Sequence, residues 1–307
     1  KEGKWMPNDL SLLMTEQQNM NTLHIDEMDT IEILNTINQE DKNVALAVRN
    51  ELVAISKAVD AIYKKVARGG RLIYIGAGTS GRLGVLDASE CPPTYGVSPT
   101  LVQGIIAGGT DALLNAIEGA EDSQELAKED LEKIELTEHD VVCGLAASGR
   151  TPYVIGGIKY ANLIGATTLS ICCVSKGLIS NFAQYPIEVK VGPEVITGST
   201  RMKAGTAQKM VLNMLSTSVM IKLGKVYGNL MIDVQPTNEK LKKRAIGIVE
   251  KCTGLASIEA KKLLESTGYD VKCAILMEKT KLDFESCRNL LLKYQNNVTK
   301  VIRQYKK

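Results

Sequence analysis

Short apolar runs that alternate with helical patterns are the feature that most constrains the fold of this chain. The runs are Arg71–Ile75, Leu101–Ala107, Asp140–Ala146 and Ala166–Cys173, with a shorter one near Tyr185–Val191. Helical patterns separate them near residues 111–118, 122–134 and 152–164. Strands that alternate with helices form parallel sheets covered on both faces, so the pattern predicts an α/β fold with a doubly wound, mostly parallel sheet.

Helical patterns flank this region on both sides. Apolar residues recur at helical spacing from Asp41 to Ala67, which predicts one long amphipathic helix, and a second long helix is expected from about Arg201 to Leu223. Beyond Asn238 no strand pattern remains, and four or five short helices are expected. We therefore expect an N-terminal segment with its helix (residues 1–59), the α/β domain (60–226) and a small C-terminal α-helical domain (238–307).

Charge and composition exclude several classes of partner. The chain has 37 Lys and Arg against 35 Asp and Glu, so neither nucleic acid nor a membrane is an expected partner. No apolar run approaches the roughly 20 residues of a membrane span, and no signal-peptide core follows Lys1–Lys4, so a cytoplasmic location is expected. The seven cysteines contain no CxxC pair, and the two histidines form no metal-binding pattern. A metal site is not expected.

The first apolar run leads into a glycine-rich loop, Gly76–Arg82, which matches the pattern G-x-G-x-x-G. A nicotinamide site would also need an acidic residue at the end of the second strand, and none stands there, because Asp111 lies too far along. Glycines let a ligand approach the backbone, and hydroxyls beside helix N-terminal amides bind anions. The loop therefore predicts a phosphate or sugar site formed by Gly78, Thr79 and Ser80.

Two further polar loops follow later strands. Thr151 is expected to cap a helix whose first residue is Pro152, so that amides and hydroxyls converge there. The phosphate ligands predicted in this loop are Ser148, Gly149, Arg150 and Thr151. Ligands of open α/β sheets bind beyond the carboxyl ends of the strands. This favours a phosphate site over the alternative that the two loops are only tight turns between a strand and a helix. In the third loop Ser199, Arg201 and Lys203 either hold a substrate carboxylate or only cap a helix and pair with surface acids, and the residues favour neither reading.

Two glutamates lie in the connections between these elements. Glu90 precedes Pro92-Pro93, which is expected to end any helix and to stiffen the loop. Glu121 lies at the junction between two expected helices, just before the capping-box pattern of Asp122–Glu125. An isolated glutamate in such a place is usually a solvated or capping side chain.

The combination of these segments resembles the N-acetylmuramic acid 6-phosphate etherase family. The matching segments are Gly76–Gly84, Asp87–Gly96, Glu118–Asp122, Ala146–Tyr153, Thr197–Lys209 and Asn229–Asp233. The resemblance covers roughly residues 25–244 and implies a sugar isomerase (SIS) domain at about residues 60–226. It also implies catalytic glutamates at Glu90 and Glu121, and a homodimer with its site at the interface. One departure is Gln18, where relatives usually carry Arg.

The activity that this resemblance implies is cleavage of the lactyl ether of a phosphorylated amino sugar, by elimination and addition of water, to N-acetylglucosamine 6-phosphate and D-lactate. Two carboxyls suffice as acid and base, with no metal or organic cofactor. We assign Glu90 as the acid and Glu121 as the base, although the sequence does not fix this order. Two alternatives use the same fold: a non-catalytic sugar-phosphate sensor, such as glucokinase regulatory protein, and an aldose–ketose isomerase.

Overall fold

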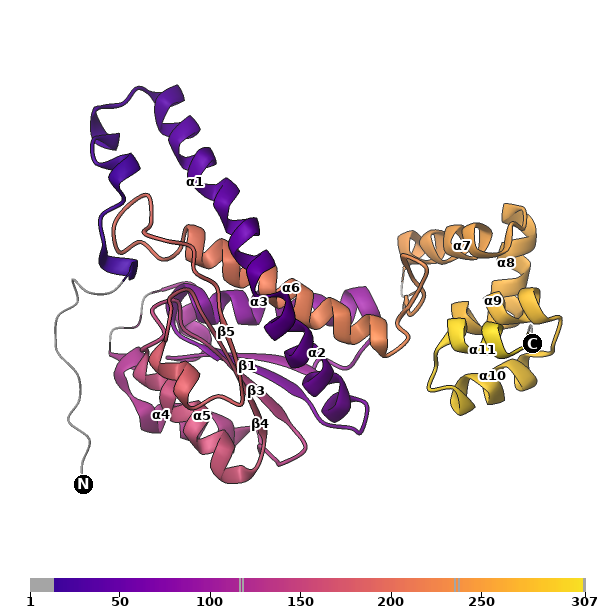
Figure 1. Cartoon of the computed structure of the whole chain (residues 1–307). Coiled ribbons are helices and arrows are strands. Elements are labelled where there is room, and N and C mark those ends of the chain that lie inside the picture. Colours follow the sequence, from indigo (N-terminus) through magenta and orange to yellow (C-terminus); the bar gives the residue numbers. More distant parts are fainter. Residues whose placement is uncertain (1–13, 116, 118, 235, 237, 306–307) are drawn as a thin grey trace. The chain divides into compact units, whose positions relative to one another are not determined.

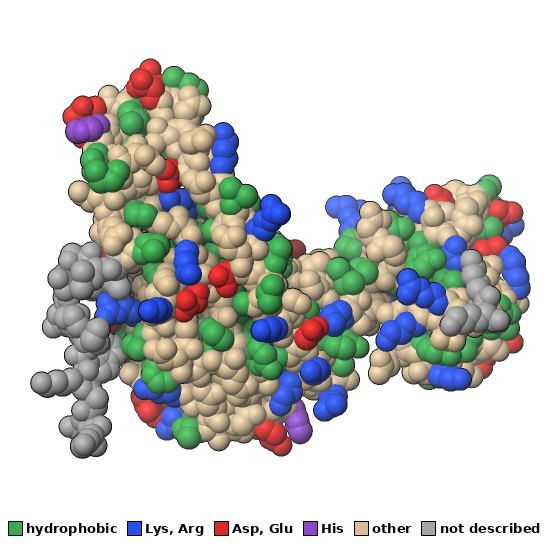
Figure 2. All heavy atoms as spheres, in the orientation of Figure 1, with side chains coloured by type: hydrophobic (Ala, Val, Ile, Leu, Met, Phe, Trp, Pro, Cys, Tyr) green, Lys and Arg blue, Asp and Glu red, His purple; other side chains and the backbone are tan. Residues whose placement is uncertain are grey.

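The computed structural model describes all residues except 1–13, 116, 118, 235, 237 and 306–307 (Figure 1). The chain divides into two compact units, one from Lys1–Ala88 and Thr100–Leu215, the other from Ser89–Pro99 and Ser216–Lys307. None of the helices formed by the described residues is both long enough and apolar enough to cross a membrane. Acidic and basic side chains are interspersed on the face seen in Figure 2, as their near-equal numbers predict.

A five-stranded parallel sheet forms the centre of the first unit, in the order β2-β1-β3-β4-β5. Each strand coincides with one of the apolar runs to within one residue, because their side chains are buried by helices on both faces. The strands are β1 (Leu72–Gly76), β2 (Val102–Ile106), β3 (Val141–Leu145), β4 (Thr167–Cys172) and β5 (Tyr185–Glu188). This confirms the predicted doubly wound parallel sheet.

Helices cover both faces of this sheet (Figure 1). Helices α4 and α5 pack together on one face, and α2, α3 and α6 lie on the other. The helices of this unit are α1 (Thr30–Asn50), α2 (Leu52–Val66), α3 (Gly78–Tyr95), α4 (Gln124–Lys133), α5 (Pro152–Ile164) and α6 (Lys203–Lys222), and the ends of α3 and α6 belong to the second unit. Short 3-10 helices occur at Met14–Glu16, Met20–Thr22, Ile25–Glu27, Thr110–Leu113, Ala120–Asp122 and Leu178–Asn181.

Helix α3 lies very close to β1 and β2 because glycine occupies the contact positions. A Cβ atom added to Gly104 of β2 would lie 2.5 Å from the Cα of Val85, and one added to Gly84 would lie 2.9 Å from the Cβ of Tyr74. Carbon atoms in contact normally stand about 3.5–4.0 Å apart, so no larger residue fits without moving the helix. The glycines thereby bring the first turn of α3 to the carboxyl end of β1.

Two predicted helices differ from those observed. The helix predicted from Asp41 to Ala67 is two helices, because α1 begins at Thr30 behind a capping box of Asp29 and Glu32, and the chain turns at Glu51. The helical pattern near residues 111–118 gives only the 3-10 helix Thr110–Leu113, and residues 116 and 118 lie outside the described residues.

Helix α3 runs through Pro92 and Pro93 to Tyr95, so the expectation that this pair ends the helix was wrong. A proline removes one helical N–H and crowds the carbonyl four residues earlier. Here the pair stands in the last turn, where few helical hydrogen bonds remain to be lost, and Gly96 N donates to Pro92 O at 2.9 Å to close the turn.

Besides the ends of α3 and α6, the described residues of the second unit form a short hairpin followed by five helices. Strands β6 (Val226–Tyr227) and β7 (Leu230–Met231) pair antiparallel, a hairpin that the sequence pattern did not predict. The helices are α7 (Glu239–Thr253), α8 (Ser257–Ser266), α9 (Val271–Thr280), α10 (Phe284–Lys293) and α11 (Val298–Tyr305). They share a core that includes Val249, Leu264, Ile275, Leu291 and Val301. The helical C-terminal part is confirmed, whereas the boundaries at residues 59, 226 and 238 stay predictions.

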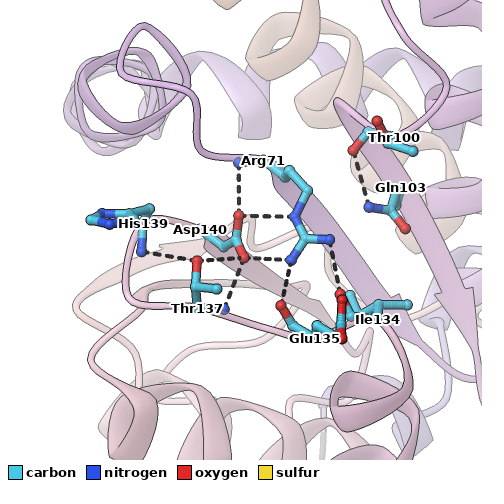
Figure 3. A network of polar contacts seen from close by, with 8 residues as sticks. All are labelled: Arg71, Thr100, Gln103, Ile134, Glu135, Thr137, His139 and Asp140. Atoms are coloured by element: carbon cyan, nitrogen blue, oxygen red, sulfur yellow. Dashed lines mark hydrogen bonds and ion pairs between the residues drawn. The ribbon is translucent and has the colours of Figure 1, made fainter.

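An ion pair joins the starts of β1 and β3, at the edge of the sheet opposite the loops (Figure 3). Arg71 Nη2 lies 2.6 Å from Oδ2 of the buried Asp140, and Arg71 also donates to Asp140 Oδ1 from Nε and from its backbone N. Thr137 donates to Asp140 from its amide and its hydroxyl. Burial raises the pKa of Asp140, but the hydrogen bonds from Arg71 and Thr137 outweigh it and hold that pKa below its usual value.

We predict that Asp140→Asn lowers the free energy of unfolding by about 2–4 kcal/mol, because it leaves part of a buried guanidinium and several donors without their anionic partner. A carboxyl whose pKa is lowered by folding stabilises above its unfolded pKa, so this difference should be complete at neutral pH and shrink as pH falls below about 4. Urea unfolding followed by circular dichroism measures it. Glu239→Gln, at an exposed pair with Lys242, is the control and should leave stability nearly unchanged. A difference that is as large at pH 2 as at pH 7 would contradict this account.

Candidate active site

Two of the predicted phosphate loops leave neighbouring strands at one edge of the sheet. Gly76 at the end of β1 lies beside Leu145 at the end of β3, and the strand order reverses between these two strands. Ligands of open α/β sheets bind at such a reversal. The loops after these strands enter α3 at Gly78 and α5 at Pro152, so two helix N-termini, each favourable to an anion, begin at this edge.

The second loop has the helix start that the sequence predicts. Thr151 is the N-cap of α5 and Pro152 is its first residue, while the Thr151 side chain makes no capping hydrogen bond. Gly149 has φ of 70°, and a Cβ there would lie 2.7 Å from the Cα of Gly177, so only glycine fits this turn. Ser148, Arg150 and Thr151 are half-buried, which leaves their polar groups partly accessible.

The first loop and Glu121 border one cavity of about 260 Å³. It lies at the carboxyl ends of β1 and β2 and is lined by Ala77, Gly78, Arg82, Ala107, Ala112, Asn115, Ile117, Gly119, Ala120 and Glu121. Glu121 is exposed and belongs to the 3-10 helix Ala120–Asp122, which follows Gly119 in the left-handed conformation. Among the described residues, those of the second and third predicted loops do not line this cavity. The structure therefore brings Gly78 and Glu121 together.

Arg82 is a residue of this cavity that the sequence reasoning did not single out. Its Nε donates to the carbonyl of Leu113 at 2.9 Å and its Nη2 to that of Asn115 at 3.2 Å. These bonds hold the wall of the cavity and place a positive charge beside it. Its position at the end of the glycine-rich loop could have indicated from the sequence that Arg82 belongs to the site.

Glu90, Thr79 and Ser80, which were also predicted as site residues, all lie on α3. Glu90 is an exposed residue of α3, two positions before Pro92, in the part of the helix that belongs to the second unit. Thr79 is half-buried, and Ser80 is buried, with its hydroxyl donating to Gln208 of α6 at 2.8 Å.

The third segment is fixed by two buried carboxylates. Glu194 accepts hydrogen bonds from the amides of Lys203 and Ala204 at 2.8 and 2.9 Å, so Glu194 caps α6 and Ser199 does not. The Lys203 side chain is buried, and its Nζ lies 2.6 Å from Glu40 Oε2. Ser199 is half-buried and Arg201 exposed. Lys203 stays a predicted ligand, but its charge is already balanced, and Arg201 is the accessible cation of this segment.

Residues 15–22, which precede α1, contact Glu40 and the segment before α6. Asn19 and Asn21 each donate from Nδ2 to Glu40 at 2.8 Å, Thr22 donates to the Val195 carbonyl, and Gly198 N donates to the Thr15 carbonyl. Burial raises the pKa of Glu40, but hydrogen bonds from Lys203, Asn21 and Asn19 outweigh it and lower that pKa. The pKa of Glu194 is raised, because burial outweighs its amide donors. Gln18, where the family usually has Arg, is exposed.

Glu40→Gln should lower the free energy of unfolding by about 3–5 kcal/mol, because it leaves the Lys203 ammonium buried without its counter-charge. The double variant Glu40→Gln/Lys203→Met should lose clearly less than the sum of the single variants, because neither charge is then left alone. Thermal and urea unfolding measure both effects. Lys42→Met, an exposed change on the same helix, is the control and should be nearly neutral. Strictly additive losses would mean that the two side chains do not stabilise each other.

Three family models match the chain. They are the N-terminal SIS domain of glucokinase regulatory protein over residues 54–162, the SIS domain over residues 117–218, and the C-terminal lid domain of glucokinase regulatory protein over residues 228–283. Among solved structures, the phosphoheptose isomerase of Francisella tularensis is 15% identical, with a TM-score of 0.49, and the match covers 63% of this chain and 100% of that one.

Curated relatives match nearly the whole chain. N-acetylmuramic acid 6-phosphate etherase of Clostridium botulinum strain Eklund 17B is 62% identical over 291 residues, which cover 95% of this chain and 97% of that protein. The etherase of Clostridium beijerinckii is 58% identical over 96% of this chain and 97% of its own length. That of Lactobacillus gasseri is 56% identical over 95% and 98%.

Proposed function

Because the chain belongs to the N-acetylmuramic acid 6-phosphate etherase family, we propose that Glu90 and Glu121 perform the acid–base chemistry by which it opens a lactyl ether. The enzyme is a carbon–oxygen lyase that acts on N-acetylmuramic acid 6-phosphate in the recycling of cell-wall amino sugars. The observation that carries this function is the 62% identity to an etherase over 95% of the chain.

Elimination explains why two carboxyls are enough. The lactyl group is joined to the sugar through an ether at C3, and its alkoxide leaves too poorly for direct displacement by water. In the open-chain sugar C1 is an aldehyde, which makes the C2 proton acidic. A base removes this proton while an acid protonates the departing lactyl oxygen, and water then adds to the unsaturated aldehyde. The products are N-acetylglucosamine 6-phosphate and D-lactate, and each proton transfer contributes about 10²–10⁴-fold.

The site supports a particular placement of the substrate. We place the 6-phosphate at the loops Gly78–Ser80 and Ser148–Thr151, where two helix N-termini meet at the strand reversal. Glu121 lines a cavity with Gly78, so it suits the base that removes the C2 proton, and Glu90 is then the acid for the lactyl oxygen. Anchoring the phosphate would hold C2 and C3 at the carboxyls. The exposed Arg201 suits the lactate carboxylate.

Glu90→Gln and Glu121→Gln should each abolish lactate release without much loss of stability, since both side chains are exposed. The two defects should differ in kind. Exchange of the C2 proton of N-acetylglucosamine 6-phosphate with D₂O needs the base but no leaving group. Glu90→Gln should therefore retain exchange, and Glu121→Gln should lose it, as followed by proton NMR.

Glu125→Gln is the matched control for this experiment, because Glu125 is an exposed glutamate four residues after Glu121, and it should keep both reactions. Exchange that survives in Glu121→Gln but not in Glu90→Gln would reverse the two roles. Full lactate release by either variant would remove that residue from the mechanism. Binding of the substrate by the wild-type enzyme without release of lactate would favour a sugar-phosphate sensor instead.

We also propose that the enzyme is a homodimer with its site at the interface. Large apolar side chains are exposed on α1 and α2, including Ile31 (60%), Leu34 (56%), Leu46 (57%) and Val53 (71%). Figure 2 shows hydrophobic side chains on the surface of the region that α1 occupies in Figure 1. A second copy of the chain would bury such side chains from water.

Light scattering should therefore give twice the chain mass of 33.3 kDa for the wild type, and Leu34→Glu/Leu46→Glu should shift the protein toward the monomer. Leu163→Glu, a change at an 84% exposed leucine of α5, is the control and should stay dimeric. A double variant that remains a dimer with full lactate release would place the interface elsewhere.

We propose a location in the cytoplasm. Support comes from the cysteines, because all seven are free and buried, as expected of a chain kept in a reducing compartment.

A further inference from the structure

Gln208 of α6 is a buried amide with an unused donor beside the first phosphate loop. Its side chain is fully buried, and its Oε1 accepts a hydrogen bond from Ser80 Oγ at 2.8 Å. Its Nε2 has no hydrogen-bond partner among the residues that the structure describes. A buried N–H without an acceptor is costly, so such a group in a folded protein calls for an explanation.

The position of this amide connects it to the predicted anion site. Ser80 stands in the first turn of α3, an 18-residue helix whose N-terminus opens at the carboxyl end of β1. A hydroxyl has one proton. While Ser80 donates that proton to Gln208, it cannot donate it to a phosphate, although the loop is otherwise suited to bind one.

Turning the amide over removes this conflict. The oxygen and nitrogen of a glutamine side chain occupy nearly equivalent positions, and hydrogen bonding decides between them. In the reversed orientation Nε2 donates one of its two protons to Ser80 Oγ, which frees the Ser80 proton, and Oε1 takes the place that Nε2 leaves. We propose that Gln208 is a positioning residue that directs the Ser80 hydroxyl toward the phosphate of the substrate. This inference rests on the phosphate placement given under the proposed function.

Binding of inorganic phosphate to the full-length protein, measured by calorimetry, tests the inference without any turnover. Gln208→Met and Ser80→Ala should each weaken phosphate binding about 5- to 20-fold, as expected for the loss of one hydrogen bond to a charged group. Because Gln208 acts through Ser80, the double variant should bind no more weakly than Ser80→Ala alone. Unchanged affinity in Gln208→Met, or losses that multiply in the double variant, would overturn the proposal.

Gln208→Glu keeps the shape of the side chain and can replace Gln208→Met if the latter does not fold. Its carboxylate only accepts, so the Ser80 proton stays turned away and phosphate binding should weaken at least as much as in Ser80→Ala. Repeating the change in the Ser80→Ala background measures the repulsion of the added charge separately. An effect of equal size with and without the Ser80 hydroxyl would overturn the proposal.

Asn162 provides a matched control at the other edge of the sheet. Its Oδ1 accepts from Thr168 Oγ1 at 2.9 Å, the same amide–hydroxyl contact near the start of β4, and its Nδ2 donates to the Phe182 carbonyl. Asn162→Leu should leave phosphate affinity unchanged. With N-acetylmuramic acid 6-phosphate, Gln208→Met should raise KM by the factor seen for phosphate and change kcat less than about twofold. If Gln208 and Ser80 are coupled in phosphate binding but the protein releases no lactate, the etherase function is wrong and this inference still holds.

Discussion

Close contact between α3 and the strands β1 and β2 is the constraint on which the rest of the site depends. A Cβ on Gly76 would lie 2.8 Å from Gly81 N, and one on Gly104 would lie 2.5 Å from the Cα of Val85. The same helix carries Gly78 and Ser80 at one end and Glu90 near the other. A larger residue at one of these contacts would displace the helix, and with it the proposed phosphate loop and a proposed catalytic carboxyl. Two glycines of the G-x-G-x-x-G pattern, Gly76 and Gly81, therefore serve helix–strand packing here.

Features that rest on local chemistry could be predicted from the sequence. Each strand of the parallel sheet coincides with an apolar run to within one residue, and the start of α5 follows from Thr151 and Pro152, because capping and the fixed proline φ act over a few residues. The buried ion pair of Lys203 could not be predicted in this way. Its partner Glu40 stands 163 residues earlier, just before the helix predicted from Asp41, and no local pattern reports that pairing. The path of α3 through Pro92 and Pro93 was missed because the cost of a proline depends on how much helix follows it.

Two buried glutamates show how the partner decides the charge of a desolvated carboxyl. Glu40 and Glu194 both lie against the start of α6, yet the pKa of Glu40 is lowered and that of Glu194 is raised. Glu40 faces an ammonium and two amides of asparagine, whereas Glu194 receives backbone amides. At Glu40 the hydrogen bonds from Lys203, Asn21 and Asn19 together outweigh burial, whereas at Glu194 burial outweighs the two backbone donors and the nearby charge of Lys203. The segment that carries Arg201 is thus fixed by one strongly ionic contact and one helix cap.

The pairing of Glu40 with Lys203 has a consequence for the order of events during synthesis. A ribosome adds about 5–20 residues per second, so Lys203 follows Glu40 by roughly ten to thirty seconds, given their separation of 163 residues. Through that interval Glu40 can pair with Asn19 and Asn21 but lacks its ammonium partner. The contacts of Thr22 with Val195 and of Thr15 with Gly198 can form only after the last strand of the parallel sheet has been synthesised, so a nascent chain interrupted before residue 195 would lack them.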